Sequence, residues 1–233
     1  MTALQYTHVN QKTHRLVASR HPTVGVFDDL TADPDDLRVA FLLESFTNDR
    51  HAAAARIALL PKNEIITGAG ASLVMAAFLQ TDERGGRFTD GRLGAWYAAF
   101  DIETAIEETI YHNERRLRAS AGGFPNRIQM RELAATVDTI LVDLRSLQTA
   151  LPDLYHPTDY TASQAFAVSL RWPPSGKPED GIVFDSVRRA GGVNACVFWP
   201  LKVPLPVIQG DRFEYNWDTR GDVTVVKLTG MSV

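Results

Sequence analysis

The C-terminal part of the chain reads GIVF at 181–184, NACVFW at 194–199, RFEYNW at 212–217 and VTVVKL at 223–228. These short runs are rich in β-branched and aromatic residues, which is typical of strands. They follow a helix-like segment at 160–172 and have no helical pattern between them. Because strands and helices do not alternate, the order of elements predicts an α+β fold rather than a doubly wound sheet.

The N-terminal half contributes further expected elements. Residues 13–19 could form a short first strand, and a helix is expected from Asp33 to about residue 46. Asp33 can cap that helix and Pro34 suits its first position. A longer amphipathic helix is predicted at 101–118, followed by a loop at 119–126 and a strand at 136–144.

Two glycine-rich stretches call for interpretation. The segment IITGAGAS at 65–72 resembles a dinucleotide fingerprint, but Leu73 stands where the third glycine belongs and no βαβ pattern follows. It is interpreted as a turn and a helix N-terminus. Residues 85–88 and 94–99 flank Asp90-Gly91, which predicts a β-hairpin.

Composition excludes several classes of protein. The formal net charge of −4 gives no basic surplus for nucleic acid or an anionic membrane. A single cysteine, Cys196, permits no internal disulfide and is interpreted as a core residue. The polar N-terminus shows no signal peptide, and no apolar stretch is long enough to span a membrane, so a cytoplasmic location is expected. No His/Cys/Asp cluster has metal-ligand spacing.

Two polar side chains near the predicted hairpin are candidates for binding. Arg87 follows two glycines, which allow close approach of a ligand, and its guanidinium could hold a pyrophosphate in bidentate fashion. The alternative is an exposed strand arginine. Tyr97 could stack on a flat heterocycle, or it could pack in the core beside Trp96.

The helix at 101–118 carries several glutamates, of which Glu108 is the best candidate. Glu108 and His112 are four residues apart and share one helix face. Glu107 shares a face with Glu103 and Glu114, a like-charged row that is expected in solvent.

Ser186 directly follows an apolar strand, a common place for a functional hydroxyl. The surrounding residues, FDSVR at 184–188, form no Gly-x-Ser-x-Gly elbow, so a serine hydrolase is not indicated.

Taken in order, these segments resemble the RES domain, a family named for an arginine, a glutamate and a serine. The resemblance covers about residues 60–202 and rests on GRFTDG at 86–91, WYAA at 96–99, TAIEETIYH at 104–112, YTASQ at 160–164 and GIVFDSVR at 181–188, with HRL at 14–16 looking like an opening strand. The chain departs from many members in having Phe88-Thr89 instead of Trp-Asn, and in a long segment before residue 60. The expected organisation is an N-terminal extension at 1–59, packed on a RES domain at 60–233.

The resemblance implies an ADP-ribosyltransferase-like fold, with a mixed or antiparallel β core and flanking helices. It implies a toxin enzyme that degrades NAD⁺ by hydrolysis or phosphorolysis, needs no cofactor besides this substrate, and is neutralised by a helix-turn-helix (Xre-like) antitoxin. Carried over to this sequence, Glu108, Arg87 and Ser186 are the catalytic candidates. Tyr97, His112 and Arg15 are expected to support substrate binding together with Arg87.

The residue types agree with that chemistry. Cleavage of a glycosidic bond passes through an oxocarbenium-like state that a carboxylate stabilises, and arginine anchors phosphates. Two alternatives stay open: transfer of ADP-ribose to a protein or another acceptor, and a non-catalytic binding protein with the same fold. A homodimer is compatible with the sequence.

Overall fold

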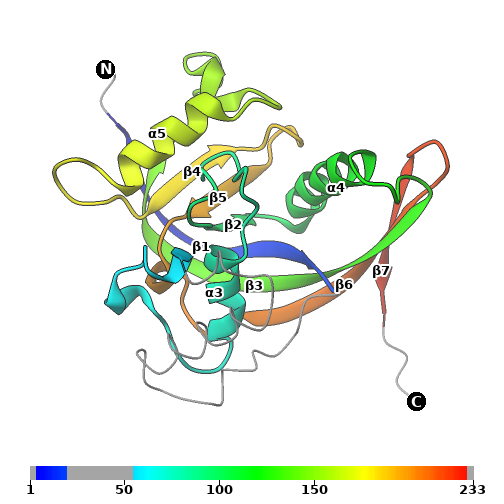
Figure 1. Ribbon diagram of the computed structural model, residues 1–233, viewed down its shortest axis with the longest axis horizontal. Helices are drawn as coiled ribbons and strands as arrows, with labels where there is room; N and C mark the ends of the chain where they lie inside the picture. The colour runs from blue at the N-terminus through cyan, green and yellow to red at the C-terminus, as the bar shows by residue number, and fades with distance from the viewer. Residues whose placement is uncertain (1–3, 20–54, 230–233) are drawn as a thin grey trace.

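The computed structural model describes residues 4–19 and 55–229 (Figure 1). Within these ranges, three helices, α3, α4 and α5, span Ala71–Leu79, Ile102–Arg118 and Thr161–Arg171. The strands are β1 (Tyr6–Ala18), β2 (Trp96–Ala99), β3 (Asn126–Asp143), β4 (Gly181–Asp185), β5 (Val193–Val197), β6 (Ile208–Trp217) and β7 (Val223–Leu228). Short 3-10 turns lie at Lys62–Glu64, Pro152–Tyr155 and Pro200–Lys202.

The seven strands form one sheet in the order β1-β2-β5-β4-β3-β6-β7. A further pairing of β1 with β3 joins β1, β2, β5, β4 and β3 into a closed circuit. In the described part of the chain, β3 and β4 run parallel and the other paired strands are antiparallel. This largely antiparallel core with flanking helices confirms the predicted α+β class.

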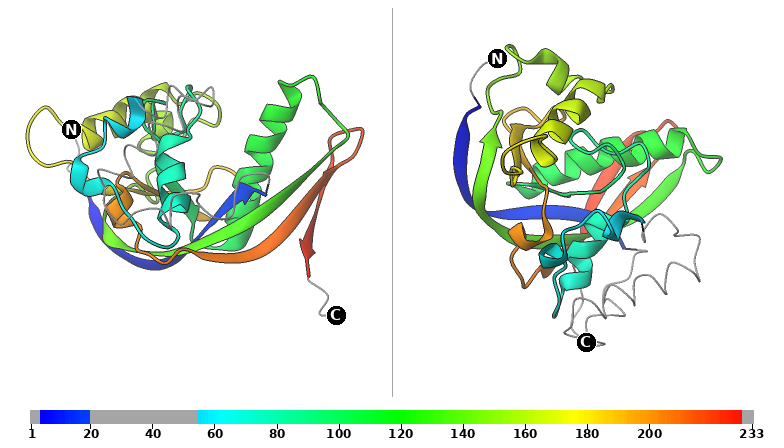
Figure 2. Two further views of the ribbon diagram at one scale, coloured as in Figure 1. Left: turned by 60° about the horizontal axis from the view of Figure 1, so that its bottom comes forward. Right: turned by 60° about the vertical axis from the view of Figure 1, so that its left-hand side comes forward.

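The long strands β1, β3 and β6 curve side by side beneath the helices (Figure 2). Helix α4 packs on this layer through a cluster that includes Leu117 of the helix, Leu16 of β1, Met130 of β3 and Phe213 of β6. A larger cluster fills the space between α3, α5 and the strands β2, β4 and β5. The two clusters therefore fix α4 at one end of the closed circuit of strands, with the β4–β5 pair beside the helix.

Helix α4 starts and ends where the sequence predicts. The Asp101 side chain accepts a hydrogen bond from the backbone N–H of Thr104 at 2.8 Å and so caps the helix. Arg115, Arg116 and Arg118 lie in the last turn, where positive charge favours the helix dipole. The predictions of α5 and of the four C-terminal strands are also confirmed, with ends that differ by at most four residues.

The predicted hairpin around Asp90-Gly91 is wrong. Only an isolated bridge joins Gly86 to Thr89, and β2 pairs with β1 and β5 instead. Side chains from elsewhere satisfy the backbone of this segment. Carbonyl groups of residues 84, 86, 91, 93 and 94 accept hydrogen bonds from Gln164, Arg56 and Arg171. Because the backbone groups have these partners, a second strand is not required.

Several boundaries differ from the predictions. Strand β1 begins at Tyr6 rather than at residue 13, and β3 covers Asn126–Asp143 rather than 136–144. Thirteen consecutive residues of β1 pair with β3, so this part of the expected N-terminal extension is an integral strand of the sheet. The predicted 65–72 segment is a turn followed by α3, with no strand before it. The helix expected from Asp33 lies outside the described residues.

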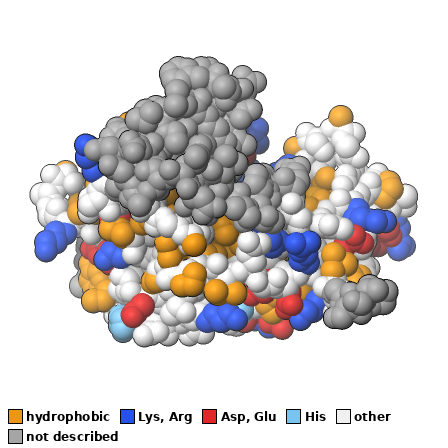
Figure 3. All heavy atoms as spheres, turned by 90° about the horizontal axis from the view of Figure 1, so that it is seen from below, with side chains coloured by type: hydrophobic (Ala, Val, Ile, Leu, Met, Phe, Trp, Pro, Cys, Tyr) orange, Lys and Arg blue, Asp and Glu red, His pale blue; other side chains and the backbone are white. Residues whose placement is uncertain are grey.

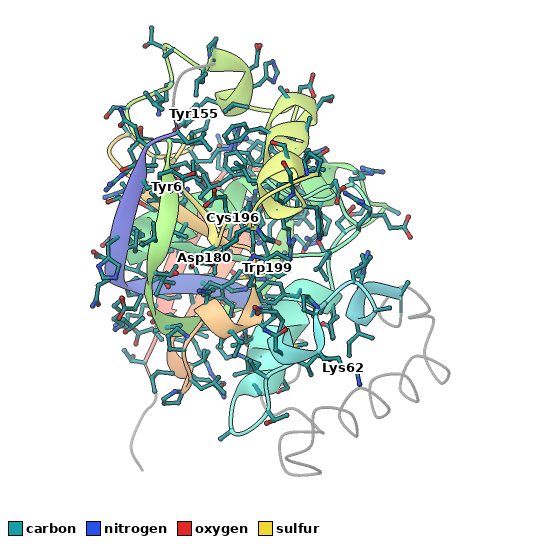
Figure 4. The ribbon with its side chains drawn as sticks, turned by 90° about the vertical axis from the view of Figure 1, so that its left-hand side faces the viewer. Tyr6, Lys62, Tyr155, Asp180, Cys196 and Trp199 are labelled. Carbon is teal, nitrogen blue, oxygen red and sulfur yellow. The ribbon has the colours of Figure 1, made fainter. Side chains whose placement is uncertain are left out.

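The surface seen from below mixes hydrophobic, basic and acidic side chains, with no single sign of charge dominating this view (Figure 3). Cys196 lies inside the molecule and is 0 % exposed, which confirms its interpretation as a core residue (Figure 4). Within residues 4–19 and 55–229, no helix is both long and apolar enough to cross a membrane.

Candidate active site

Glu108 meets Ser186 and Asn194, although these residues are 78 and 86 positions away in the sequence. Helix α4 presents Glu108 toward the β4–β5 pair, where Ser186 follows β4 and Asn194 lies in β5. The Ser186 hydroxyl and the Asn194 side-chain amide both donate to Glu108 Oε1, at 2.7 and 2.8 Å. We call these three residues the Glu108 cluster.

All the hydrogen-bonding positions of the Ser186 hydroxyl are occupied by protein groups. It donates to Glu108 and accepts hydrogen bonds from the backbone N–H groups of Arg188 and Arg189, both at 3.0 Å. A hydroxyl has one donor and two acceptor lone pairs, so none remains for a substrate. Ser186 is also buried. This geometry suits orientation of Glu108 and does not suit nucleophilic attack.

Arg87 lies in the loop before β2 and is only 8 % exposed. Its Nη1 donates to the carbonyl groups of Leu154 and His156, both at 2.9 Å. Its guanidinium lies over the ring of Tyr160, 4.7 Å from the centroid. Within the described residues, Arg87 Nη2 and Nε have no protein acceptor. Two carbonyl groups therefore hold Arg87 while part of its donor fork stays unused.

Arg188 lies within electrostatic range of Arg87, and both contact Tyr160. It donates to the Pro157 carbonyl and to the Tyr160 hydroxyl, and its guanidinium stacks on Tyr111. Burial lowers the pKa of Arg87, and the charge of Arg188 lowers it further, while the charge of Glu108 opposes this shift. No acidic side chain forms an ion pair with either arginine in the described part of the chain. This arginine pair is a site of concentrated positive charge beside Glu108.

Tyr97 holds the loop that carries Arg87. Its hydroxyl accepts a hydrogen bond from the backbone N–H of Phe88 at 2.8 Å, and the half-buried ring packs against the core. Gly86 makes this contact feasible, because a Cβ there would lie 3.0 Å from the Tyr97 hydroxyl oxygen. Arg15 donates to the Tyr97 carbonyl at 3.0 Å and lies over the Trp96 ring. Tyr97 therefore supports the loop that carries Arg87, and Arg15 supports Tyr97.

His112 lies near the arginine pair but does not join the Glu108 cluster. Its ring contacts Tyr111 edge-on, with centroids 5.2 Å apart. Although the residue as a whole is exposed, loss of solvation and then the charge of Arg188 lower the pKa of His112 to about 4. The imidazole is therefore neutral at pH 7.

The glutamate row on the outer face of α4 is only partly solvated. Glu103 and Glu107 are exposed, as predicted. Glu114 is half-buried and accepts a hydrogen bond from the Trp217 indole at 3.2 Å, so it does not belong to a free surface row.

The described residues contain no group of three or more His, Cys, Asp or Glu side chains that could hold a metal ion.

The family model of the RES domain matches this sequence over residues 65–218, which include Arg87, Glu108 and Ser186. The chain belongs to the RES-domain family.

A similar solved structure is a chain from the crystal structure of the M. tuberculosis MbcT-MbcA toxin-antitoxin complex. The likeness covers 96 % of this chain and 87 % of that one, at 14 % sequence identity and a TM-score of 0.45. No curated protein matches the chain.

Sequence reasoning missed two residues of this RES-domain site. Asn194 heads an apolar strand, and only the pairing of Phe184 with Asn194 in the β4–β5 ladder brings it close to Ser186. Arg188 belongs to the GIVFDSVR segment at 181–188, which by itself indicates no role for this arginine. A prediction that the strands at 181–184 and 194–199 pair with each other would have placed Asn194 near the site.

Proposed function

We propose that this RES-domain protein cleaves the nicotinamide–ribose bond of NAD⁺ and acts as the toxin of a toxin–antitoxin pair. The observation that supports this most is the Glu108 cluster beside the arginine pair. A half-buried carboxylate with fixed orientation lies within electrostatic range of Arg87, which in turn is within range of the charge of Arg188. A substrate that develops positive charge and carries a pyrophosphate complements both features.

Cleavage of the nicotinamide–ribose bond requires a negatively charged carboxylate near the ribose rather than a general acid that protonates the leaving group. When the C1′–N bond breaks, its electron pair goes to the nicotinamide ring, which leaves as a neutral base. The ribose takes on oxocarbenium character, and the charge of Glu108 stabilises it. Water or phosphate then attacks C1′. Attack by water, with loss of a proton, gives ADP-ribose.

Arg87 and Arg188 supply the positioning in this proposal. Guanidinium groups bind phosphate oxygens through charge-assisted hydrogen bonds, and Arg87 keeps Nη2 and Nε for this purpose. Tyr97 acts indirectly, because its hydroxyl holds the loop that carries Arg87. Arg15 in turn holds Tyr97 through the Tyr97 carbonyl group. His112, neutral at pH 7, adds no positive charge that would oppose the developing cation.

The direct test is to incubate the pure protein with NAD⁺ and measure free nicotinamide by chromatography, with and without inorganic phosphate. Release of nicotinamide with ADP-ribose as co-product supports hydrolysis, and a phosphorylated co-product supports phosphorolysis. Label transferred from NAD⁺ to a protein would indicate ADP-ribosyl transfer instead. Activity should persist in EDTA. No nicotinamide release under any of these conditions would refute the proposal.

The proposal includes an antitoxin that inhibits the enzyme, because an enzyme that consumes NAD⁺ freely would arrest the growth of its own host. The expected partner is a small helix-turn-helix protein of the Xre-like type that covers the site. Growth should stop on expression of this chain alone and recover on co-expression with a gene adjacent to its own. A Glu108→Gln variant, which should be harmless without a partner, is the matched control. Toxicity that persists with each neighbouring gene would count against the pairing.

A further inference from the structure

The hydrogen bonds to Glu108 are strongly asymmetric. Ser186 and Asn194 both donate to Oε1, while no donor contacts Oε2 within residues 4–19 and 55–229. Both donors are buried, at 6 % exposure each, whereas Glu108 is only half-buried. The carboxylate is therefore held by one oxygen, and the other oxygen is unoccupied by the protein.

We propose that Asn194 is a positioning residue that, together with Ser186, fixes Glu108 so that Oε2 faces the ribose of the substrate. The inference rests on the proposed function and adds to it which carboxylate oxygen acts and which residue selects it. Two donors on one oxygen define the plane of the carboxylate, whereas a single donor would leave it free to rotate about that contact.

Asn194 is suited to this role by its place in the sheet. Its backbone is paired on both sides, with Phe184 of β4 and with Ala99 of β2, which fixes its Cα. Its amide can only donate to a carboxylate, and it does so in a buried environment where an unmade hydrogen bond would be costly. Ser186 has no such support from two strands, but two backbone N–H groups hold its hydroxyl.

The sharpest test is Asn194→Asp, which keeps the size of the side chain and replaces the donor with a second carboxylate. Two carboxylates at this separation cannot both ionise, so they share a proton and the pair titrates at higher pH. The acidic limb of the kcat/KM profile for nicotinamide release should therefore move up by at least about one pH unit. An asparagine whose side chain does not contact Glu108 would reduce the activity without moving the limb.

A matched control makes the same chemical change away from the site. Asn126→Asp adds one negative charge at a half-buried position at the start of β3, where the side chain hydrogen-bonds to the Gly123 carbonyl and to the backbone N–H of Arg127. Its pH profile should coincide with that of the parent. If Asn194→Asp also keeps the parental limb, or if Asn126→Asp moves it equally, the proposal is overturned.

A second measurement does not depend on activity. In Asn194→Asp the folded pKa of the carboxylate pair is raised above the unfolded values, so stability is present at low pH and lost as pH rises through the raised folded pKa. The deficit in Tm relative to the parent should therefore grow from pH 4 to pH 8. The exchanged variant Glu108→Gln/Asn194→Asp restores a donor–acceptor pair, so its Tm deficit should no longer increase with pH. Nicotinamide release should stay lost, because the negative charge has moved from the helix to the strand.

These readouts separate the two proposals. If the parent releases no nicotinamide, the proposed function fails, and the Tm series alone decides whether Asn194 acts on the charge of Glu108. A deficit that is independent of pH, or that persists in the exchanged variant, overturns the role of Asn194 whether or not the parent is active. Recovery of activity in the exchanged variant would also overturn it, since the position of the charge would then not matter.

Discussion

Replacing Glu108 by Gln should separate catalysis from folding. The glutamine side chain has the same shape, and its carbonyl oxygen can accept the hydrogen bonds that Ser186 and Asn194 donate to Oε1. The amide nitrogen then occupies the place of Oε2. The fold is kept, and the negative charge is removed from the position where the proposed substrate becomes positive.

The expected magnitudes follow from these contacts. Hydrogen bonds to a charged acceptor are about twice as strong as neutral ones, so loss of charge at two bonds should lower the free energy of unfolding by no more than about 2 kcal/mol. Removal of a preorganised charge at the reacting centre commonly lowers the rate by ~10²–10³-fold, about 2.7–4 kcal/mol. The loss in turnover should thus exceed the loss in stability.

Glu107→Gln provides a control on the same helix. It changes the net charge by the same amount, but Glu107 is exposed. Its stability should stay within about 0.5 kcal/mol of the parent and its turnover should be unchanged. Both variants are assayed for nicotinamide release and by urea denaturation. An inactive Glu107→Gln beside an active Glu108→Gln would refute the assignment of the site.

Three further predictions follow from other contacts. Arg87→Ala should weaken binding of NAD⁺ by ~10- to 100-fold, about 1.5–3 kcal/mol, and unchanged affinity in calorimetry would make Arg87 a structural residue only. Burial raises the pKa of Cys196 to about 12, so its thiol stays protonated at pH 8; this single cysteine should react with a thiol reagent only after unfolding, and stoichiometric labelling of the folded protein would contradict its placement. Arg171→Met should lower the free energy of unfolding by about 2–4 kcal/mol, because the buried guanidinium is hydrogen-bonded to the carbonyl groups of residues 93, 94 and 198; a urea midpoint equal to that of the parent would show that these carbonyl groups find other partners.

The elements that the sequence predicted well are those whose cause is local. Helix α4 has a capping Asp101 and an apolar stripe, and the C-terminal strands have β-branched runs bounded by turns. Helical spacing also separates Glu108 from Glu107, because successive residues are about 100° apart. The resemblance to the RES domain identified Arg87, Glu108 and Ser186 without any structure, and the family model covers all three. Their catalytic roles remain proposals.

Only the tertiary structure decided what lies around those residues. The segment before β2 lacks a strand because Gln164, Arg56 and Arg171, all distant in sequence, bind its carbonyl groups. The length of β3 depends on partners from three other strands, β1, β4 and β6. Asn194 carries no local signal of function, and it reaches Glu108 because the β4–β5 pairing and the packing of α4 bring residues 86 positions apart to 2.8 Å. Side-chain hydrogen bonds over such separations depend on the whole fold, so no pattern within one segment can encode them.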